Sequence, residues 1–488
     1  MRIFLFIALL TSTCFVQAQN NVVDEIKANI VRPEAEAHLR FLAADEMKGR
    51  DAGSPELDIA ANYIKTQFRM LNISPAPGTN DYFQAVNLVK HSPPSKGTGI
   101  IGKDEYVLKD NLLLLDGGSF KWNGEMVYVG YGSVEDLTAI DVKGKVVLAL
   151  AGARDADNIN KIYAASLEKF ARLKRAGATA VVELLVFNQV PWSALINAFH
   201  KSKWSIMEGE SSTPLIWLKP KNMKELSLKH GQKIKGKFDV EGSGGKVIPG
   251  KNVAGLIPGT DPALKDEYIV ITAHYDHVGV DKTAEKGDSI FNGARDNATG
   301  TVALIQTAKF LSKHPGKRSV ILLAVTCEEK GLLGSQWYVR HPLVPLKQTV
   351  LNVNCDGVGY NDKTRVTSIS LGRTNMDEVL SSAAAEFGFS LGGDPDPREG
   401  FYERSDQVSF AREGVPAIKL QPGLEKMDED IFKYYHKQAD EVSSMDLDYI
   451  TRFYQTFVYA VYLLSNDARK PAWVKGDKFE EAGRKLYE

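Results

Sequence analysis

The chain has 488 residues, of which 43% are hydrophobic and 25% are charged, and its formal net charge is −1. This length suits two or three domains, and the composition is that of an ordinary globular protein. The near-neutral charge gives no electrostatic reason to expect nucleic acid or an anionic membrane as a partner, and we predict no nucleic-acid binding. The oligomeric state stays open.

The N-terminus has the pattern of a signal peptide. A positive charge at Arg2 precedes a mostly apolar run over residues 3–15, and a small-x-small pattern ends at Ala18. We expect cleavage after Ala18 and export to the periplasm or the cell exterior. Lipidation of Cys14 is the alternative, although Thr13 is a poor residue before a lipidated cysteine. The apolar run is too short to span a bilayer, and no later stretch predicts a transmembrane helix.

Cys327 and Cys355 are the cysteines that remain after this cleavage, and each directly precedes a carboxylate residue. Two cysteines do not make a disulfide framework in an exported chain of this length. We therefore expect two buried thiols at strand ends. A disulfide between them would need those strand ends to lie close together.

Residues 23–90 are expected to be mainly helical. In ELDIAANYIKTQFRML, apolar side chains recur at helical spacing and form a stripe that should face a core. Ser54 and Pro55 supply an N-cap and a first turn in front of this segment. A Pro-Ala-Pro-Gly sequence at 75–78 ends it.

Residues 95–248 differ, because short β-type runs alternate with turns. EMVYVGYG, KVVLALAG, AVVELLVF, TPLIWL and KIKGKFDV are of this type, and one helix-like stretch at 164–176 lies among them. The glycines of EGSGG have the composition of a linker at the end of this block. We predict a separate, β-rich domain of roughly 150 residues.

After Gly250, strands alternate with helices, of which 298–313 is the clearest. The apolar β-type runs lie at 267–274, 319–326, 349–355 and 415–421. Near-continuous apolar strands of this kind predict a parallel sheet that is buried on both faces. The stretch from about Ala468 is polar and is expected at the periphery.

Five side chains of metal-ligand type accompany this pattern. They are His274 in ITAHYDH, Asp296 in GARDNATG, Glu329 in TCEEKG, Asp356 in NVNCDG and His436 in YYHKQAD. Most of them follow apolar strands, and in an open α/β sheet ligands bind at the carboxyl ends of the strands. Two histidines and three carboxylates without a thiolate suit zinc or a similar divalent ion held for chemistry. The set indicates hydrolysis.

Each motif alone also has a structural explanation. Glu328 and Glu329 could be the acidic first turn of a helix, stabilised by its dipole. GARDNATG could be a surface turn. One shared site explains five such residues, in order along the chain, better than five separate explanations do.

HYDH, RDNATG, CEEKGLLGS, NCDGVG and YYHKQADE resemble the M28 family of co-catalytic zinc peptidases, as do GRDAGSPELDIAANYI and ERSDQVSFAREGVPA. The resemblance implies an α/β fold of the zinc-exopeptidase type, with a mixed, mainly parallel sheet flanked by helices. The block at 95–248, with DVKGKVVLAL and KRAGATAVV, resembles a protease-associated (PA) domain, which some members carry as an insertion. The implied domains are a signal peptide at 1–18, a peptidase domain at 19–94 and 249–470, the PA-like insertion at 95–248 and a tail at 471–488.

Carried over residue by residue, the resemblance implies two zinc ions per chain. Asp296 would bridge both ions. His274 and Asp356 would complete the ligands of one ion, and Glu329 and His436 those of the other.

Neighbouring residues receive roles in the same way. Asp276 would fix the imidazole two residues before it, and Glu328 would be the general base. Tyr435 would contact the substrate carbonyl, and Arg404 and Asp406 would border the substrate.

Two residues near these motifs receive no such role. His277 is expected to be structural, with a supporting role at the site as the alternative. Gln407 stands where many relatives have histidine, outside the metal-ligand set, so it bears on substrate binding at most.

These residue types suit peptide hydrolysis, because a bound metal lowers the pKa of water from about 16 to about 7. The resemblance implies an exported aminopeptidase acting on peptides, with a metal-bridging hydroxide as nucleophile and Glu328 as base. A carboxypeptidase or dipeptidase with the same site is the alternative. A non-catalytic receptor-like protein and a single-zinc aminoacyl cyclase are less favoured, because the chain keeps the full ligand set and the base.

Overall fold

The structure is a computed structural model that describes residues 22–207, 213–221, 228–242, 245–284 and 287–488. The predicted signal peptide at 1–18, including Cys14, lies outside the described residues. Within these ranges we find no helix that combines the length and the hydropathy needed to cross a lipid bilayer.

The chain divides into two compact units. Unit 1 contains the residues up to Val86 and those from Pro249 onward, and unit 2 is the segment Asn87–Ile248. The chain passes between the units within two strands, β2 (Phe83–His91) and β12 (Gly245–Ile257). The expectation of helix up to residue 90 is therefore wrong for the last part of that segment. Val86 and Leu88 are buried and alternate with exposed residues, which is the period of a strand.

A mixed sheet forms the centre of unit 1. Its strands lie in the order β17-β16-β18-β15-β13-β14-β12, and β1 pairs with β12. The strands β1 (Ser74–Pro75), β13 (Tyr268–His274), β14 (Ser319–Val325), β15 (Thr349–Asn354), β16 (Arg365–Ser368), β17 (Ser390–Gly392) and β18 (Ala417–Pro422) accompany β12 in this sheet. The pairs β13–β14, β13–β15 and β15–β18 are parallel, whereas β12 and β16 are antiparallel to their neighbours β14 and β18. The predicted α/β fold with a mixed sheet is confirmed.

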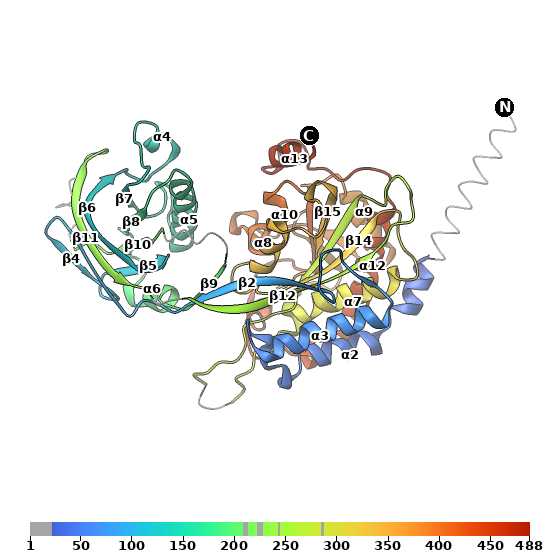
Figure 1. Cartoon of the computed structure of the whole chain (residues 1–488). Helices are drawn as coiled ribbons and strands as arrows, with labels where there is room; N and C mark the ends of the chain where they lie inside the picture. The colour runs from blue at the N-terminus through green and yellow to red at the C-terminus, as the bar shows by residue number, and fades with distance from the viewer. Residues whose placement is uncertain (1–21, 208–212, 222–227, 243–244, 285–286) are drawn as a thin grey trace. The chain divides into compact units, whose positions relative to one another are not determined.

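Helices cover both faces of this sheet (Figure 1). Residues 22–29 are helical, and the named helices of unit 1 are α2 (Arg32–Leu42), α3 (Pro55–Met70), α7 (Thr299–Leu311), α8 (Leu333–Arg340), α9 (Asp377–Glu386), α10 (Gln407–Arg412), α11 (Glu429–Phe432), α12 (Leu447–Asn466) and α13 (Glu480–Tyr487). Successive side chains of a strand point to opposite faces. In β14, Val320, Leu322 and Ala324 accordingly join a core with α2, α3, α7, α9 and α12, and Ile321, Leu323 and Val325 join one with α8 and α10. Both faces of the sheet are therefore buried.

The C-terminal stretch packs more closely than its polar composition suggested. Trp473 and Phe479 are both buried within the core that includes α8 and α10. The indole of Trp473 donates a hydrogen bond to the carbonyl oxygen of Gly414 (2.9 Å). These two aromatic side chains help to anchor the stretch to unit 1.

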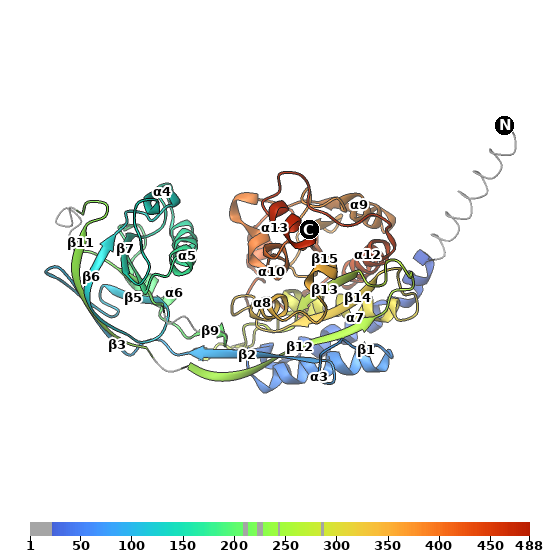
Figure 2. The ribbon, with the colours of Figure 1, turned by 45° about the horizontal axis from the view of Figure 1, so that its top comes forward.

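Unit 2 has a sheet of its own, with strands in the order β4-β3-β11-β6-β7-β8-β10-β5. These strands are β3 (Lys96–Ile101), β4 (Asp104–Val107), β5 (Leu112–Asp116), β6 (Phe120–Tyr128), β7 (Val146–Leu150), β8 (Ala180–Leu184), β10 (Leu215–Leu218) and β11 (Lys233–Glu241), while β9 (Lys203–Ile206) pairs with β2. The helices are α4 (Val134–Leu137), α5 (Ile159–Arg175) and α6 (Trp192–Phe199), and Figure 2 shows α5 beside β7. Two apolar clusters fill this unit, which therefore has its own core.

Cys327 and Cys355 are both buried and unpaired, as expected. Cys355 directly follows β15, and Cys327 lies two residues beyond the end of β14.

Candidate metal centre

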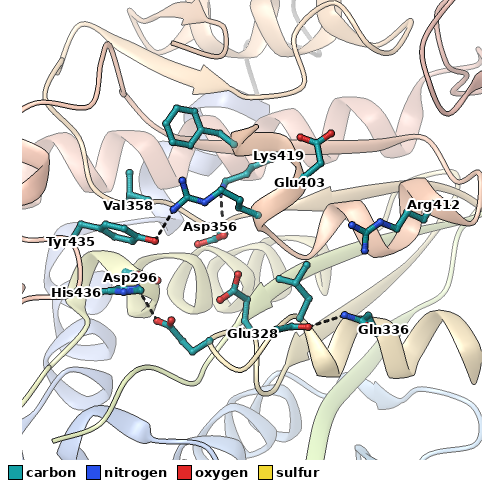
Figure 3. Close-up of a pocket in the computed structure, with 15 residues that line it drawn as sticks. Asp296, Glu328, Gln336, Asp356, Val358, Glu403, Arg412, Lys419, Tyr435 and His436 are labelled. Carbon is teal, nitrogen blue, oxygen red and sulfur yellow. Dashed lines mark hydrogen bonds and ion pairs between the residues drawn. The ribbon is translucent and has the colours of Figure 1, made fainter. Parts of the chain in front are cut away.

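Three of the five predicted ligands lie at or after the carboxyl ends of three parallel strands. His274 is the last residue of β13, Glu329 lies just beyond the end of β14, and Asp356 lies just beyond the end of β15. Asp296 comes from the irregular turn Ala294–Ala298 in front of α7, and His436 from the loop after α11. Figure 3 shows Asp296, Glu328, Asp356 and His436 around one cavity, which has a volume of about 440 Å³.

The donor atoms form two groups that meet at Asp296. His274 Nε2 lies 3.2 Å from Asp356 Oδ1 and 3.3 Å from Asp296 Oδ1. His436 Nε2 lies 3.1 Å from Asp296 Oδ2 and 3.3 Å from Glu329 Oε1. One oxygen of Asp296 thus faces each group.

His277 belongs to the second group, although the sequence predicted a structural residue. It is fully buried, and its Nδ1 lies 2.8 Å from Glu329 Oε1. His277, Asp296, Glu329 and His436 offer donor atoms within 4.8 Å of one another. The available signal was its place in HYDH, three residues after His274, but a single histidine at that spacing has many structural explanations.

Asp276 contacts the backbone of the glutamates as well as the imidazole that it was expected to fix. Its Oδ1 lies 3.9 Å from His274 Nδ1, and that nitrogen instead lies 3.2 Å from the backbone oxygen of Asp276. The carboxylate accepts hydrogen bonds from the backbone N–H groups of Glu328 (3.1 Å) and Glu329 (3.2 Å). Asp276 therefore fixes the backbone that carries both glutamates.

Buried polar residues hold the remaining loops of the site. Arg50, which is 1% exposed, donates hydrogen bonds to the carbonyl oxygens of Tyr275 (2.9 Å) and Gly293 (3.0 Å). It thereby joins the end of β13 to the turn that carries Asp296. On the other side, Asp440 Oδ2 accepts a hydrogen bond from the backbone N–H of Asp296 (3.2 Å). The position of Asp296 between the two donor groups is thus set from two directions.

The carboxyl groups of the site differ in their electrostatic environment. Burial and the nearby carboxylates of Asp356 and Asp406 raise the pKa of Glu328 well above its usual value. Burial acts on Asp296 in the same direction, but hydrogen bonds from His274 and His436 hold its pKa well below the usual value. Opposed shifts of this kind separate a group that can carry a proton from groups that stay ionised.

This donor set fits a divalent cation. Imidazole nitrogens and carboxylate oxygens without thiolate are typical of catalytic zinc sites. The carboxylates of Asp296, Glu329 and Asp356 converge in a buried position, which requires positive charge nearby. Lys419 supplies part of it, since its Nζ lies 3.1 Å from Asp356 Oδ2, but no sequence pattern marked this lysine inside an apolar strand.

The predicted substrate residues have different positions. Tyr435 and Arg404 line the cavity, and Arg404 Nη2 donates a hydrogen bond to Tyr435 Oη (3.4 Å). Asp406 is fully buried at the start of α10 and does not line the cavity. Gln407 is also fully buried, where its side chain bonds to Asn354 and to the carbonyl oxygen of Tyr402.

The chain is similar to known proteins in sequence and in fold. Residues 252–461 match the sequence profile of Peptidase family M28. The chain is 23% identical over 360 residues to aminopeptidase YwaD of Bacillus subtilis. The alignment covers 71% of this chain and 68% of that protein. It is 33% identical over 138 residues to a probable zinc metalloprotease of Pyrenophora tritici-repentis, only 27% of that protein. An aminopeptidase structure from Aneurinibacillus sp. strain AM-1 covers 92% of this chain and 97% of its own, with a TM-score of 0.55 and 20% identity, and so shows the fold.

Proposed function

Because residues 252–461 belong to peptidase family M28, we propose that the chain is a zinc-dependent exopeptidase and, more specifically, an aminopeptidase. The observation that carries the proposal is the position of Asp296, whose two oxygens each face one group of nitrogen and oxygen donors. This arrangement suits a carboxylate shared by two zinc ions. His274 and Asp356 would bind one ion, and Glu329 and His436 the other.

Zinc bound there would lower the pKa of a water molecule and polarise the scissile carbonyl. Glu328 lines the cavity, where its carboxylate would accept a proton from the attacking water and return it to the leaving amine. Tyr435 would donate a hydrogen bond to the carbonyl oxygen, and Arg404 would hold the phenol in place. Asp276 would hold the backbone of Glu328 and Glu329 in place by accepting hydrogen bonds from their N–H groups.

The aminopeptidase assignment is supported by the similarity to aminopeptidase YwaD of Bacillus subtilis, whose alignment extends over most of both chains. A carboxypeptidase or dipeptidase with the same donor set is the second candidate. A receptor-like protein without activity is disfavoured, because all five ligand-type residues and Glu328 are present and converge.

The remaining parts of the proposal concern organisation. We propose that unit 2 corresponds to a PA-like insertion into the peptidase domain, which the chain order of the two units supports. We also propose export through residues 1–18, which the sequence pattern of that segment supports.

Chelation and a blocked N-terminus test the reaction together. We expect the zinc-loaded protein to hydrolyse peptides with a free N-terminus, to lose this activity after chelation and to regain it with zinc. N-acetylated copies of the same peptides should be resistant. Equal cleavage of blocked and free peptides would exclude an aminopeptidase, and activity that survives verified metal removal would exclude the metal centre.

Glu328→Gln tests the proposed base. The substitution preserves the shape of the side chain but removes the proton acceptor, so we expect kcat to fall by at least about 10²-fold. Zinc content, measured by atomic absorption, should stay close to that of the unmodified protein. Normal turnover in this variant would assign the base elsewhere.

A further inference from the structure

The cavity beside the candidate metal centre contains more charge than the proposed reaction uses. Apart from the proposed ligands and Glu328, its charged lining residues are Glu403, Arg404, Arg412 and Lys419. Lys419 is paired with Asp356, and Glu403 is paired with Lys478. Each carboxylate that lines the cavity is therefore a proposed metal ligand, the proposed base or the partner of a lysine.

The two arginines have no such partner. Within the described part of the chain, neither guanidinium forms an ion pair with a carboxylate. Arg404 is hydrogen-bonded to the phenol of Tyr435 and lies 5.5 Å from the centre of the Phe401 ring. Arg412 is exposed at the end of α10, and Figure 3 shows its side chain on the side of the cavity where Gln336 lies.

A planar guanidinium binds a carboxylate through two parallel N–H···O bonds, which makes arginine selective for this group. We propose that Arg412, in the wall of the cavity that also contains the donor groups, binds a substrate carboxylate. The inference rests on the proposed peptidase function and names its substrate class. The carboxylate belongs either to an acidic side chain on the cleaved N-terminal residue or to the C-terminus of a dipeptide.

The other residues that line the cavity also suit a short substrate with a polar group at one end. Leu332, Val358 and Phe401 supply apolar surface, and Gln336 adds a neutral polar group. The volume of about 440 Å³ accommodates a few residues and not a folded chain. A substrate carboxylate would balance the positive charge that the protein itself leaves unpaired.

Matched substrates separate the two carboxylate sources. Glutamyl and glutaminyl p-nitroanilides differ in the charge of the cleaved residue alone, whereas Ala-Ala and Ala-Ala-amide differ in the C-terminal charge alone. We expect the zinc-loaded full chain to prefer the charged member of one pair in kcat/KM. Arg412→Gln should reduce that preference roughly tenfold, and Arg412→Glu should reverse it. Arg175→Gln, an exposed arginine at the end of α5, is the matched control and should leave the preference unchanged.

Binding provides a reading that does not depend on turnover. In titration calorimetry on the zinc-loaded Glu328→Gln variant, either glutamic acid α-amide or Ala-Ala should bind more tightly than its neutral counterpart. Adding Arg412→Gln should remove this difference. If neutral substrates are hydrolysed but no carboxylate is preferred, or if the preference survives both Arg412 variants, the inference is wrong and the peptidase proposal stands. If the unmodified zinc-loaded protein binds the carboxylate through Arg412 but hydrolyses none of these substrates, the peptidase proposal fails, and only the carboxylate-binding role of Arg412 stands.

Discussion

The two histidines of HYDH illustrate how one short segment serves both donor groups. His274 ends β13 and faces Asp356, while His277 turns back toward Glu329 from the following loop. Both are buried. His277 therefore lies beside the carboxylate of Glu329, and we infer that it helps to hold this carboxylate in place.

We predict that His277→Ala weakens zinc binding by about 10- to 100-fold, the usual loss when a residue that orients a ligand is removed. The reason is that Glu329 Oε1 loses the imidazole that lies 2.8 Å away. Competition with a fluorescent chelator measures the affinity. His230→Ala, at an exposed position of unit 2, is the control. An affinity within twofold of the unmodified protein would show that His277 only fills space.

The candidate site could be predicted from the sequence where its residues follow apolar strands. His274, Glu329 and Asp356 are of this kind, because strand ends bring distant residues together in a parallel sheet. The residues that were missed depend on tertiary packing. Lys419 lies inside a strand, and Arg412 ends a short helix that carries no motif, so only their positions in the fold reveal a role.

At the scale of elements, the contact between α7 and the end of β15 places Asp296 beside Asp356. Gly300, in the first turn of α7, lies directly against the carbonyl oxygen of Cys355 and the side chain of Asn297. Asn297 also donates a hydrogen bond to that carbonyl oxygen (3.0 Å). No side chain fits between the two elements at this point.

Gly300→Ala is therefore expected to destabilise the protein by about 1–3 kcal/mol through overpacking. It should also weaken zinc binding, because the turn that carries Asp296 must move. Urea unfolding and chelator competition measure the two effects. Gly118→Ala adds the same methyl group where nothing lies within 4 Å and should change neither quantity. If both variants behave alike, the close approach at Gly300 does not position the site.

Elements with a strong period were predictable, and those set by tertiary context were less so. The apolar runs at 267–274, 319–326 and 349–355 became β13, β14 and β15. No prediction covered α12, although Phe453, Phe457 and Leu464 recur at helical spacing and all three are buried. The expectation of helix extended wrongly into β2, because this strand follows long helical segments in the chain. The alternation of buried and exposed residues in β2 is the pattern of a strand.

At the scale of the whole molecule, the two units contain separate cores. In unit 2 the buried ammonium of Lys169 lies 2.7 Å from Glu183 Oε1, and the indole of Trp217 donates to Glu183 Oε2 (2.7 Å). The pair is enclosed within unit 2, with 2% exposure for Lys169 and none for Glu183. This unit thus satisfies its most costly buried charges internally.

We expect residues 87–248, produced alone, to fold and to unfold cooperatively in urea, because a complete sheet and two apolar clusters lie within this segment. In that fragment, Lys169→Met should cost about 3–5 kcal/mol, since it leaves the carboxylate of Glu183 buried without its cation. Lys161→Met in the same helix breaks a pair whose side chains are 56% and 69% exposed, so the loss should be about 0–1 kcal/mol. A fragment without a cooperative transition would mean that unit 2 depends on the rest of the chain for its stability. Equal losses in the two variants would mean that the buried Lys169–Glu183 pair contributes no more than an exposed one.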